Sequence, residues 1–175
     1  MDGRTLDGKV ESTTGGVARN VADCLARLKL NPFLISTAGA GEYAQLLLGK
    51  MAHMDVSGIK IIQDARTATC VIILDSKGEC LFVVGDMNIH ERLSLEQVDT
   101  HNEIISSAPL VIIDGNIPKK TMDHIFEICI RYRVPEKKEI FKVSFYILQK
   151  TVYSTKKNDA YILNANSSGL KLTTP

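Results

Sequence analysis

The chain of 175 residues is 45% hydrophobic and 23% charged, which is typical of one folded globular domain and excludes a largely disordered protein. Its formal net charge of +1 gives no electrostatic reason to expect nucleic acid or a membrane surface as a partner. The sequence shows no charged-then-apolar leader and no apolar run long enough to span a bilayer. We therefore expect a cytoplasmic protein.

Neither the cysteines nor the histidines show the spacing of a metal site, and the cysteines do not form a disulfide framework. The cysteines stand at positions 24, 70, 80 and 129. The histidines stand at positions 53, 90, 101 and 124. We expect buried thiols in a reducing compartment, histidines at the surface or at helix ends, and no bound metal.

The first third of the chain alternates predicted strands and helices. Residues 9–13 predict a short strand that leads to the pair Gly15-Gly16. From Val17 onward, apolar residues recur at the spacing of one buried helix face. The next predicted elements are a buried strand over 33–38, a helix over 42–54 and a strand over 56–62.

Two β-rich runs, 67–74 and 80–84, flank the polar segment 75–79, and this pattern predicts a hairpin. Ser94 with Gln97 three residues later resembles a capping box and predicts a helix to about residue 106. A strand over 109–114 and a helix over 117–132 follow. Strands that alternate with helices predict an α/β fold: a parallel sheet flanked by helices, with the hairpin as a β flap.

Residues 136–175 lack this rhythm. Residues 140–148 predict one strand, whereas 156–175 are rich in Asn, Ser and Thr and predict a loose terminus. We therefore place a domain boundary at residue 135 and expect a poorly packed tail after it.

The glycine pair is the first candidate binding element. Without a Cβ atom, Gly15 and Gly16 let the backbone turn sharply and a ligand approach its N–H groups. Asn20 follows about one helical turn later, so its amide can point into the same concavity. The alternative is an ordinary turn from a strand to a helix.

The hairpin and the residues after it supply further polar candidates. Thr67 and Thr69 alternate onto one face of a strand, where hydroxyls can meet a ligand. Asp86 and Asn88 share one side of an extended segment and offer an acceptor and an amide. The alternatives are exposed threonines that favour β structure and plain loop polarity.

Asn116 follows a buried strand, and ligands of open α/β sheets bind at the carboxyl ends of strands. The alternative is a turn asparagine before Pro118.

Four runs of the sequence together resemble the ribokinase-like (PfkB) carbohydrate kinase family, most closely its pseudouridine kinase branch. They are GGVARNVA at 15–22, RTAT at 66–69, GDMNI at 85–89 and DGNIP at 114–118. The resemblance covers about residues 4–135 and then stops. It implies a partial ribokinase-like fold with a β-hairpin lid and an incomplete C-terminal half.

This resemblance implies ATP-dependent phosphorylation of the ribose 5′-hydroxyl of a nucleoside, with ATP and Mg²⁺. It also implies that the candidates named above bind the nucleoside or sugar, and that the lid can pair with a second copy in a homodimer. Two alternatives stay open: a non-catalytic isoform that binds a nucleoside or dimerises through its lid, and a different PfkB sugar or nucleoside kinase.

Residues 39–42, Gly-Ala-Gly-Glu, resemble the family's G-A-G-D motif, whose Asp is the general base. That motif comes late in the family, after the equivalent of Asn116, so we do not assign Glu42 a catalytic role. In the family the first strand lies upstream of the glycine pair, and the ATP site and base lie in the C-terminal half. We therefore expect this chain to be catalytically incompetent and name no catalytic residue.

Overall fold

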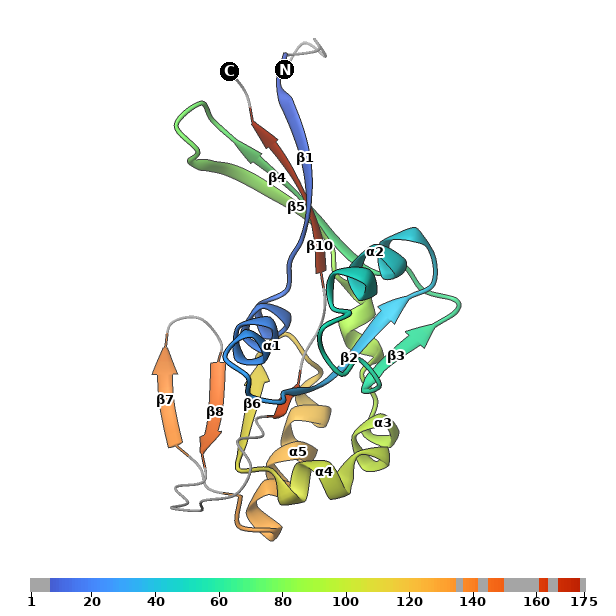
Figure 1. Ribbon diagram of the computed structural model, residues 1–175, viewed down its shortest axis with the longest axis vertical. Helices are drawn as coiled ribbons and strands as arrows, with labels where there is room; N and C mark the ends of the chain where they lie inside the picture. Colours follow the sequence, from blue (N-terminus) through green and yellow to red (C-terminus); the bar gives the residue numbers. More distant parts are fainter. Residues whose placement is uncertain (1–6, 135–136, 142–144, 150–160, 164–166, 174–175) are drawn as a thin grey trace.

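The computed structural model describes residues 7–134 and, as backbone alone, residues 137–141, 145–149, 161–163 and 167–173. The chain forms a six-stranded central sheet flanked by helices, and a four-stranded second sheet projects from one end of it (Figure 1). We call this second sheet the lid. Within the described residues, no helix is both long and apolar enough to cross a membrane.

The central sheet has the strand order β3-β2-β9-β6-β8-β7. β2, β3, β6 and β9 run parallel, whereas β8 is antiparallel to β6 and β7 is antiparallel to β8. The strand bounds are β2 Phe33–Gly39, β3 Ile59–Ile62, β6 Leu110–Asp114, β7 Lys137–Phe141, β8 Phe145–Gln149 and β9 Tyr161–Leu163. The predicted parallel α/β sheet is confirmed, although β3 begins at Ile59 rather than at residue 56.

Helices cover both faces of the central sheet. Their bounds are α1 Val17–Arg27, α2 Glu42–Lys50, α3 Leu95–Thr100, α4 Asn102–Ser107 and α5 Lys119–Arg131. Phe33 and Ile35 of β2 pack in one apolar cluster with α3, α4 and α5. Leu34 and Ala38 pack on the opposite face with α1 and α2. Side chains alternate between the two faces of a strand, so an apolar run such as β2 fills both layers.

Two helices differ from the prediction. α2 ends at Lys50, and residues 51–54 form turns instead of continuing the helix. The predicted helix over 94–106 is divided into α3 and α4, because the backbone at His101 departs from helical geometry. Its predicted start is confirmed, since the Ser94 side chain accepts a hydrogen bond from the Gln97 N–H at 3.2 Å.

The lid has the strand order β1-β10-β4-β5. Its strands are β1 Lys9–Thr14, β4 Ala68–Leu74, β5 Cys80–Asp86 and β10 Ser167–Thr173. The predicted hairpin is confirmed: Asp75 Oδ1 accepts from the N–H groups of Lys77 and Glu79, each at 2.9 Å. Gly78 in the turn has φ +84°, a conformation that favours glycine.

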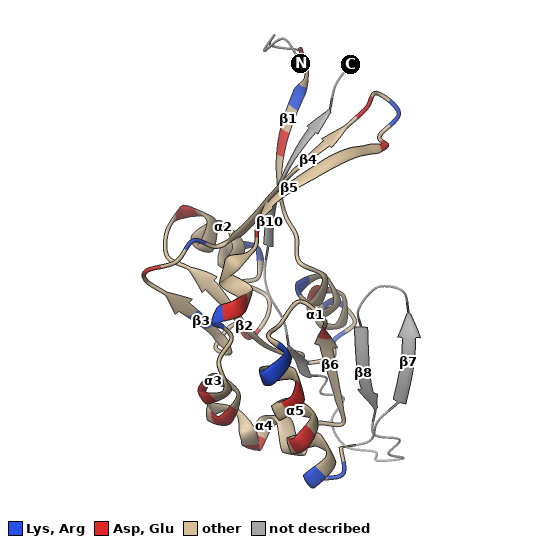
Figure 2. Cartoon of the chain, turned by 180° about the vertical axis from the view of Figure 1, so that it is seen from behind, with Lys and Arg blue, Asp and Glu red and all other residues tan. Residues whose placement is uncertain are grey.

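Charged side chains mark the turn of this hairpin and the outer sides of α3, α4 and α5, whereas β4 and β5 are almost free of charge (Figure 2).

Cys24 and Cys80 are exposed, so the expectation of buried thiols is wrong for these two. Only Cys129 is buried among the four.

The C-terminal strands occupy inner positions in both sheets. β9 lies between β2 and β6, and β10 lies between β1 and β4. The expected loose terminus over 156–175 is therefore wrong for residues 161–163 and 167–173. Backbone N–H and C=O groups on facing strands require partners, and these segments supply them. The domain boundary at residue 135 and the poor packing of the tail remain predictions.

Candidate functional site

The carboxyl ends of β2 and β6 meet the first turn of α1 at the edge of the central sheet from which the lid projects (Figure 1). Open α/β sheets bind ligands in the crevice at this edge. The short 3₁₀ helix η1, Asn88–Arg92, connects the lid strand β5 to the same edge. Its Ile89 carbonyl accepts a 3.1 Å hydrogen bond from the Thr37 hydroxyl of β2.

The start of α1 depends on glycine and on a buried arginine. Gly16 has φ +96°, which residues with a side chain rarely adopt. Arg19 is only 7% exposed, and its Nε donates to the Gly15 carbonyl at 2.7 Å. The same guanidinium donates to the Thr14 carbonyl at 3.1 Å and to Asn20 Oδ1. Arg19 therefore joins the last residue of β1 to the first turn of α1 and fixes the exposed Asn20 amide.

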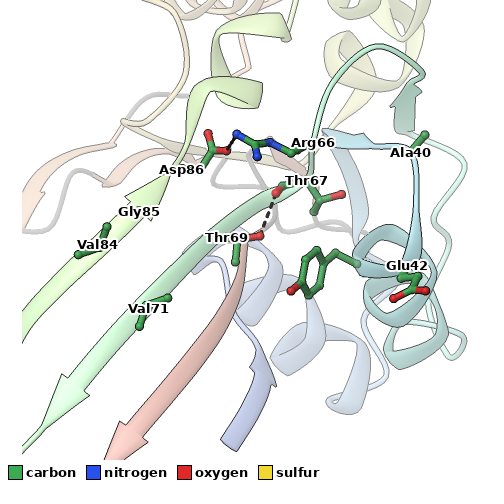
Figure 3. A pocket seen from close by; sticks show the side chains of 10 residues that line it. Ala40, Glu42, Arg66, Thr67, Thr69, Val71, Val84, Gly85 and Asp86 are labelled. Carbon is green, nitrogen blue, oxygen red and sulfur yellow. Dashed lines mark hydrogen bonds and ion pairs between the residues drawn. The ribbon is translucent and has the colours of Figure 1, made fainter. Parts of the chain in front are cut away.

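A cavity of about 370 Å³ lies between the lid and the start of α2 (Figure 3). Thr67, Thr69 and Asp86 line it, as does Glu42. Binding pockets for small molecules have volumes of this order. The lid cavity thus brings together three of the predicted site residues.

The two threonines of the lid cavity differ in what their hydroxyls bind. Thr67 is 3% exposed, and its Oγ1 both donates to the Gly39 carbonyl and accepts from the Gly39 N–H, each at 3.1 Å. The Thr67 hydroxyl therefore holds the lid to the end of β2. Thr69 Oγ1 donates to the Thr67 carbonyl at 3.0 Å, and Thr69 lines the lid cavity (Figure 3).

An ion pair separates the lid cavity from a second one. Arg66 Nη2 lies 2.7 Å from Asp86 Oδ2, and both residues line both cavities. The second cavity has about 380 Å³ and is also lined by Asn88 and Arg92. Arg92 contacts Asp64 at 3.0 Å, and this hydrogen bond lowers the pKa of the Asp64 carboxyl. Asp86 and Asn88 therefore share a cavity, although the expected extended segment is wrong, because β5 ends at Asp86 and Asn88 begins η1.

Asp114, the last residue of β6, is buried at the carboxyl edge, only 4% exposed. Its Oδ1 accepts from the N–H of Asn116 at 3.0 Å and from Asn116 Nδ2 at 2.6 Å. The carboxylate also accepts a hydrogen bond from the Ala18 N–H in the first turn of α1. Burial raises the pKa of Asp114, and these hydrogen bonds and nearby His90 oppose the rise.

The histidines divide into two kinds. His53 and His124 lie at the surface, 2.6 Å from Asp23 and Asp99 respectively. His90 and His101 are partly buried, and burial lowers the pKa of each ring. Within the described part of the chain, His90 Nε2 is buried without a hydrogen-bond partner.

A sequence model of pfkB family carbohydrate kinases matches residues 2–145. The chain belongs to the pfkB carbohydrate kinase family. The match extends past residue 135, where we expected the resemblance to end. The chain is similar to the pseudouridine kinase of Escherichia coli strain K12, with 34% identity over 122 residues. It is also similar to the pseudouridine kinase of Arabidopsis thaliana, with 32% identity over 136 residues.

The similarity covers 69% and 77% of this chain but only 39% and 36% of these two kinases. The chain thus spans less than two-fifths of the curated relatives it matches. A solved carbohydrate kinase from Agrobacterium tumefaciens has the same fold, with a TM-score of 0.61 at 20% identity. That alignment covers 77% of this chain and 45% of the solved one, which confirms a partial ribokinase-like fold.

The pfkB family implies ATP and Mg²⁺, so we asked whether the residues of this site suit them. Among the described residues, no group of three or more His, Cys, Asp or Glu side chains could hold a metal ion. The lid cavity combines Arg66 with Glu42 and Asp86, and the second cavity balances two arginines with two aspartates. Neither charge balance favours a polyphosphate. The residues that line these two cavities therefore do not fit the ATP–Mg²⁺ complex.

The predicted site residues fall into two linked groups. Thr67, Thr69, Asp86 and Asn88 line the two cavities. Gly15, Gly16, Asn20 and Asn116 line neither cavity and instead surround Arg19 and Asp114. Sequence reasoning missed Arg19, His90 and Asp114. The only local signal was the Asp-Gly-Asn spacing, in which an aspartate commonly accepts from the N–H two residues later.

Proposed function

We propose that this chain is the nucleoside-recognising part of a pseudouridine-kinase-type protein. One observation carries the proposal: the glycine pair, the Asp-Gly-Asn turn and the segment after β5 come from distant parts of the sequence, yet all lie at one carboxyl edge. The hydrogen bonds from Ala18 and Asn116 to Asp114 connect two of these segments directly. Similarity to two pseudouridine kinases at 32–34% identity supports the choice of nucleoside.

The chemistry of the edge suits an uncharged, polyhydroxylated ligand. Ribose hydroxyls both donate and accept hydrogen bonds, and the uracil base has a polar edge. Thr69, Asn88 and Asn116 carry hydroxyl and amide groups, and the two arginines that line the cavities are paired with carboxylates. In the complete reaction, ATP with Mg²⁺ would supply the phosphoryl group for the ribose 5′-hydroxyl. The residues that line the two cavities do not suit that complex, so we propose that this chain does not transfer phosphate alone.

Calorimetric titration tests the recognition. Pseudouridine should bind weakly and saturably, and more tightly than ribose. Asn88→Ala should weaken binding by about 1–3 kcal/mol, because a polar group of the ligand loses its partner. The matched control is Asn102→Ala in α4, at the end of the molecule opposite the lid (Figure 1). Equal affinity for ribose would favour a different pfkB sugar kinase, and no binding of either would contradict the proposal.

A second candidate function is dimerisation through the lid. Four consecutive apolar residues of β5, 81–84, are between 50% and 64% exposed, as is Val10 of β1 at 62%. An exposed apolar strand of this kind commonly marks an interface. Light scattering of the wild type against Leu81→Lys and Val83→Lys tests it: the wild type should be a dimer and both variants monomers. A wild-type monomer at high concentration would contradict it.

A further inference from the structure

We propose that Arg19 and Asp114 are positioning residues that set the hydrogen-bond polarity of the site, by turning Asn20 and Asn116 in opposite senses. The inference rests on the proposed nucleoside site for its consequence, although the orientations themselves can be tested without any ligand. Neither residue needs to touch a substrate. Each acts through the asparagine that it holds.

The Asn116 amide is fixed by its nitrogen. Nδ2 donates to Asp114 Oδ1 at 2.6 Å, and the Asn116 backbone N–H donates to the same oxygen at 3.0 Å. A carboxylate only accepts hydrogen bonds, so it selects the NH₂ end of the amide. Since Asn116 is exposed, its Oδ1 is the end presented to solvent and to a ligand. Asn116 therefore offers an acceptor.

The Asn20 amide is fixed by its oxygen. The Arg19 guanidinium donates to Asn20 Oδ1, and a guanidinium has no acceptor to offer in return. Arg19 is itself held by the carbonyls of Thr14 and Gly15. Because Asn20 is exposed, its NH₂ group is the end that a ligand meets. Asn20 therefore offers donors, and the two amides present complementary polarity.

Asp114 suits this task because its position is rigid. It ends the buried strand β6, and the Ala18 N–H of α1 also donates to its carboxylate. The first N–H groups of a helix have no partner within the helix and carry partial positive charge, so a carboxylate there is favourable. One buried group thus fixes both the start of α1 and the Asn116 side chain.

The consequence is a specificity rule for the ligand. A group that donates, such as a hydroxyl hydrogen or an imino N–H, should meet Asn116. A group that accepts, such as a carbonyl or hydroxyl oxygen, should meet Asn20. A ligand in which the donor is replaced by an O-methyl or N-methyl group should lose affinity at Asn116, because the Asn116 oxygen would then face a methyl group.

Side-chain amide NMR on the ligand-free chain tests the orientations. The Asn116 NH₂ protons should exchange with water more slowly than those of Asn20. In Asp114→Ala the exchange of both the Asn116 NH₂ and the Ala18 backbone N–H should rise by about tenfold, the effect of losing one hydrogen bond to a charged group. Asp99→Ala, which removes a surface carboxylate bound to His124, is the matched control and should leave both unchanged.

If Asp114→Ala does not fold, Asp114→Asn keeps one acceptor oxygen and should preserve slow Asn116 exchange when that oxygen faces Asn116. Unchanged exchange at Asn116 in a folded Asp114→Ala chain would overturn the proposal, as would faster exchange of Asn116 than of Asn20 in the wild type. Pseudouridine is then added: Asn20 NH₂ resonances should shift more than those of Asn116. If both amides have the expected orientations but pseudouridine shifts none of their resonances, the proposed function would be contradicted and the inference about Arg19 and Asp114 would stand.

Discussion

β2 and β5 are strands of equal length that meet opposite environments. Every residue of β2 is buried, with one apolar cluster on each face. In β5, residues 81–84 are all at least half exposed. The central sheet therefore holds its own geometry, whereas residues 81–84 of the lid strand are left largely uncovered by the described residues. We expect polar groups on the central sheet to keep fixed positions and those on the lid to be more adaptable.

The polar groups follow the same division. Thr37 and Asp114 of the central sheet are buried and hydrogen-bonded, as is Gln97 of α3, which donates to the Ser36 carbonyl of β2. On the lid side, Asp86 forms an ion pair with Arg66, a residue that is 86% exposed. The difference predicts large effects of substitution in the first region and small effects in the second.

The largest expected effect is in β2. Leu34→Ala removes a fully buried side chain from the cluster of α1 and α2 and should lower the free energy of unfolding by about 2–5 kcal/mol. Val83→Ala in β5 is the control and should change it by less than about 0.5 kcal/mol. Urea denaturation measures both. Similar losses would show that the lid strand is covered in solution.

The next effect is at the junction of the two regions. Thr67→Val leaves the N–H and C=O of Gly39 without the hydroxyl that each contacts, and should cost about 1–3 kcal/mol in urea denaturation. Thr69→Val removes the hydrogen bond from the Thr69 hydroxyl to the Thr67 carbonyl and should cost less. If the two variants were equally stable, the Thr67 hydroxyl would not be the group that joins the lid to β2.

A smaller effect concerns pH. Burial lowers the pKa of His90 and His101 from 6.5 in the folded chain. As the pH falls below about 6.5, the unfolded chain binds protons that the folded chain does not, so the free energy of unfolding should fall. Above pH 7 it should be level. Thermal melts from pH 5 to 7.5 measure how steeply the melting temperature depends on pH. This dependence should be shallower for His90→Gln than for the wild type, and shallowest for the double variant His90→Gln with His101→Gln.

Asp114 should give stability the opposite dependence on pH, and at lower pH than the histidines. Its pKa is raised in the folded chain, so stability should fall as the pH rises from about 3.9 to the raised value. Asp114→Asn should remove this trend, and it should steepen the fall in stability due to the histidines, because the Asp114 charge raises the pKa of His90 against the effect of burial. A pH dependence below 6.5 that Asp114→Asn left unchanged would show that the Asp114 charge does not act on His90.

The smallest expected effect is on the lid ion pair. Arg66→Gln removes an exposed partner of Asp86 and should change the free energy of unfolding by less than about 0.5 kcal/mol. The same variant should still weaken nucleoside binding if the pair orients Asp86 between the two cavities. A large loss of stability would show that this ion pair stabilises the fold as much as the buried hydrogen bonds of the central sheet do.

The sequence predicted the elements whose signals are local. The alternation of strands and helices, the hairpin with Asp75 and Gly78, and the Ser94 cap were all visible as patterns over a few residues. The break at His101 was not, because the capping and apolar patterns run through it. Nor was the position of β9 and β10, since their apolar runs are short and stand among many Asn, Ser and Thr residues, while the facing strands that pair with them are distant in sequence.

The site shows the same limit. Gly16 and Asn116 could be named because glycine and a turn asparagine have local roles. Asp114 and Arg19 were missed, because their importance arises from contacts made only after folding, from β6 to α1 and from α1 back to β1. Thr67 was named as a binding residue, yet both hydrogen bonds of its hydroxyl go to Gly39.

We expect a nucleoside to bind at the carboxyl edge of the central sheet, beneath the lid. Backbone amide NMR during titration with pseudouridine tests it most directly. The account predicts that the largest shifts occur at Gly16, Asn20, Asn88 and Asn116, with a smaller one at Thr69. Another cavity, of about 320 Å³, lies beside Gly58 and Thr100. Shifts confined to that cavity, or no saturable shifts at all, would contradict the account.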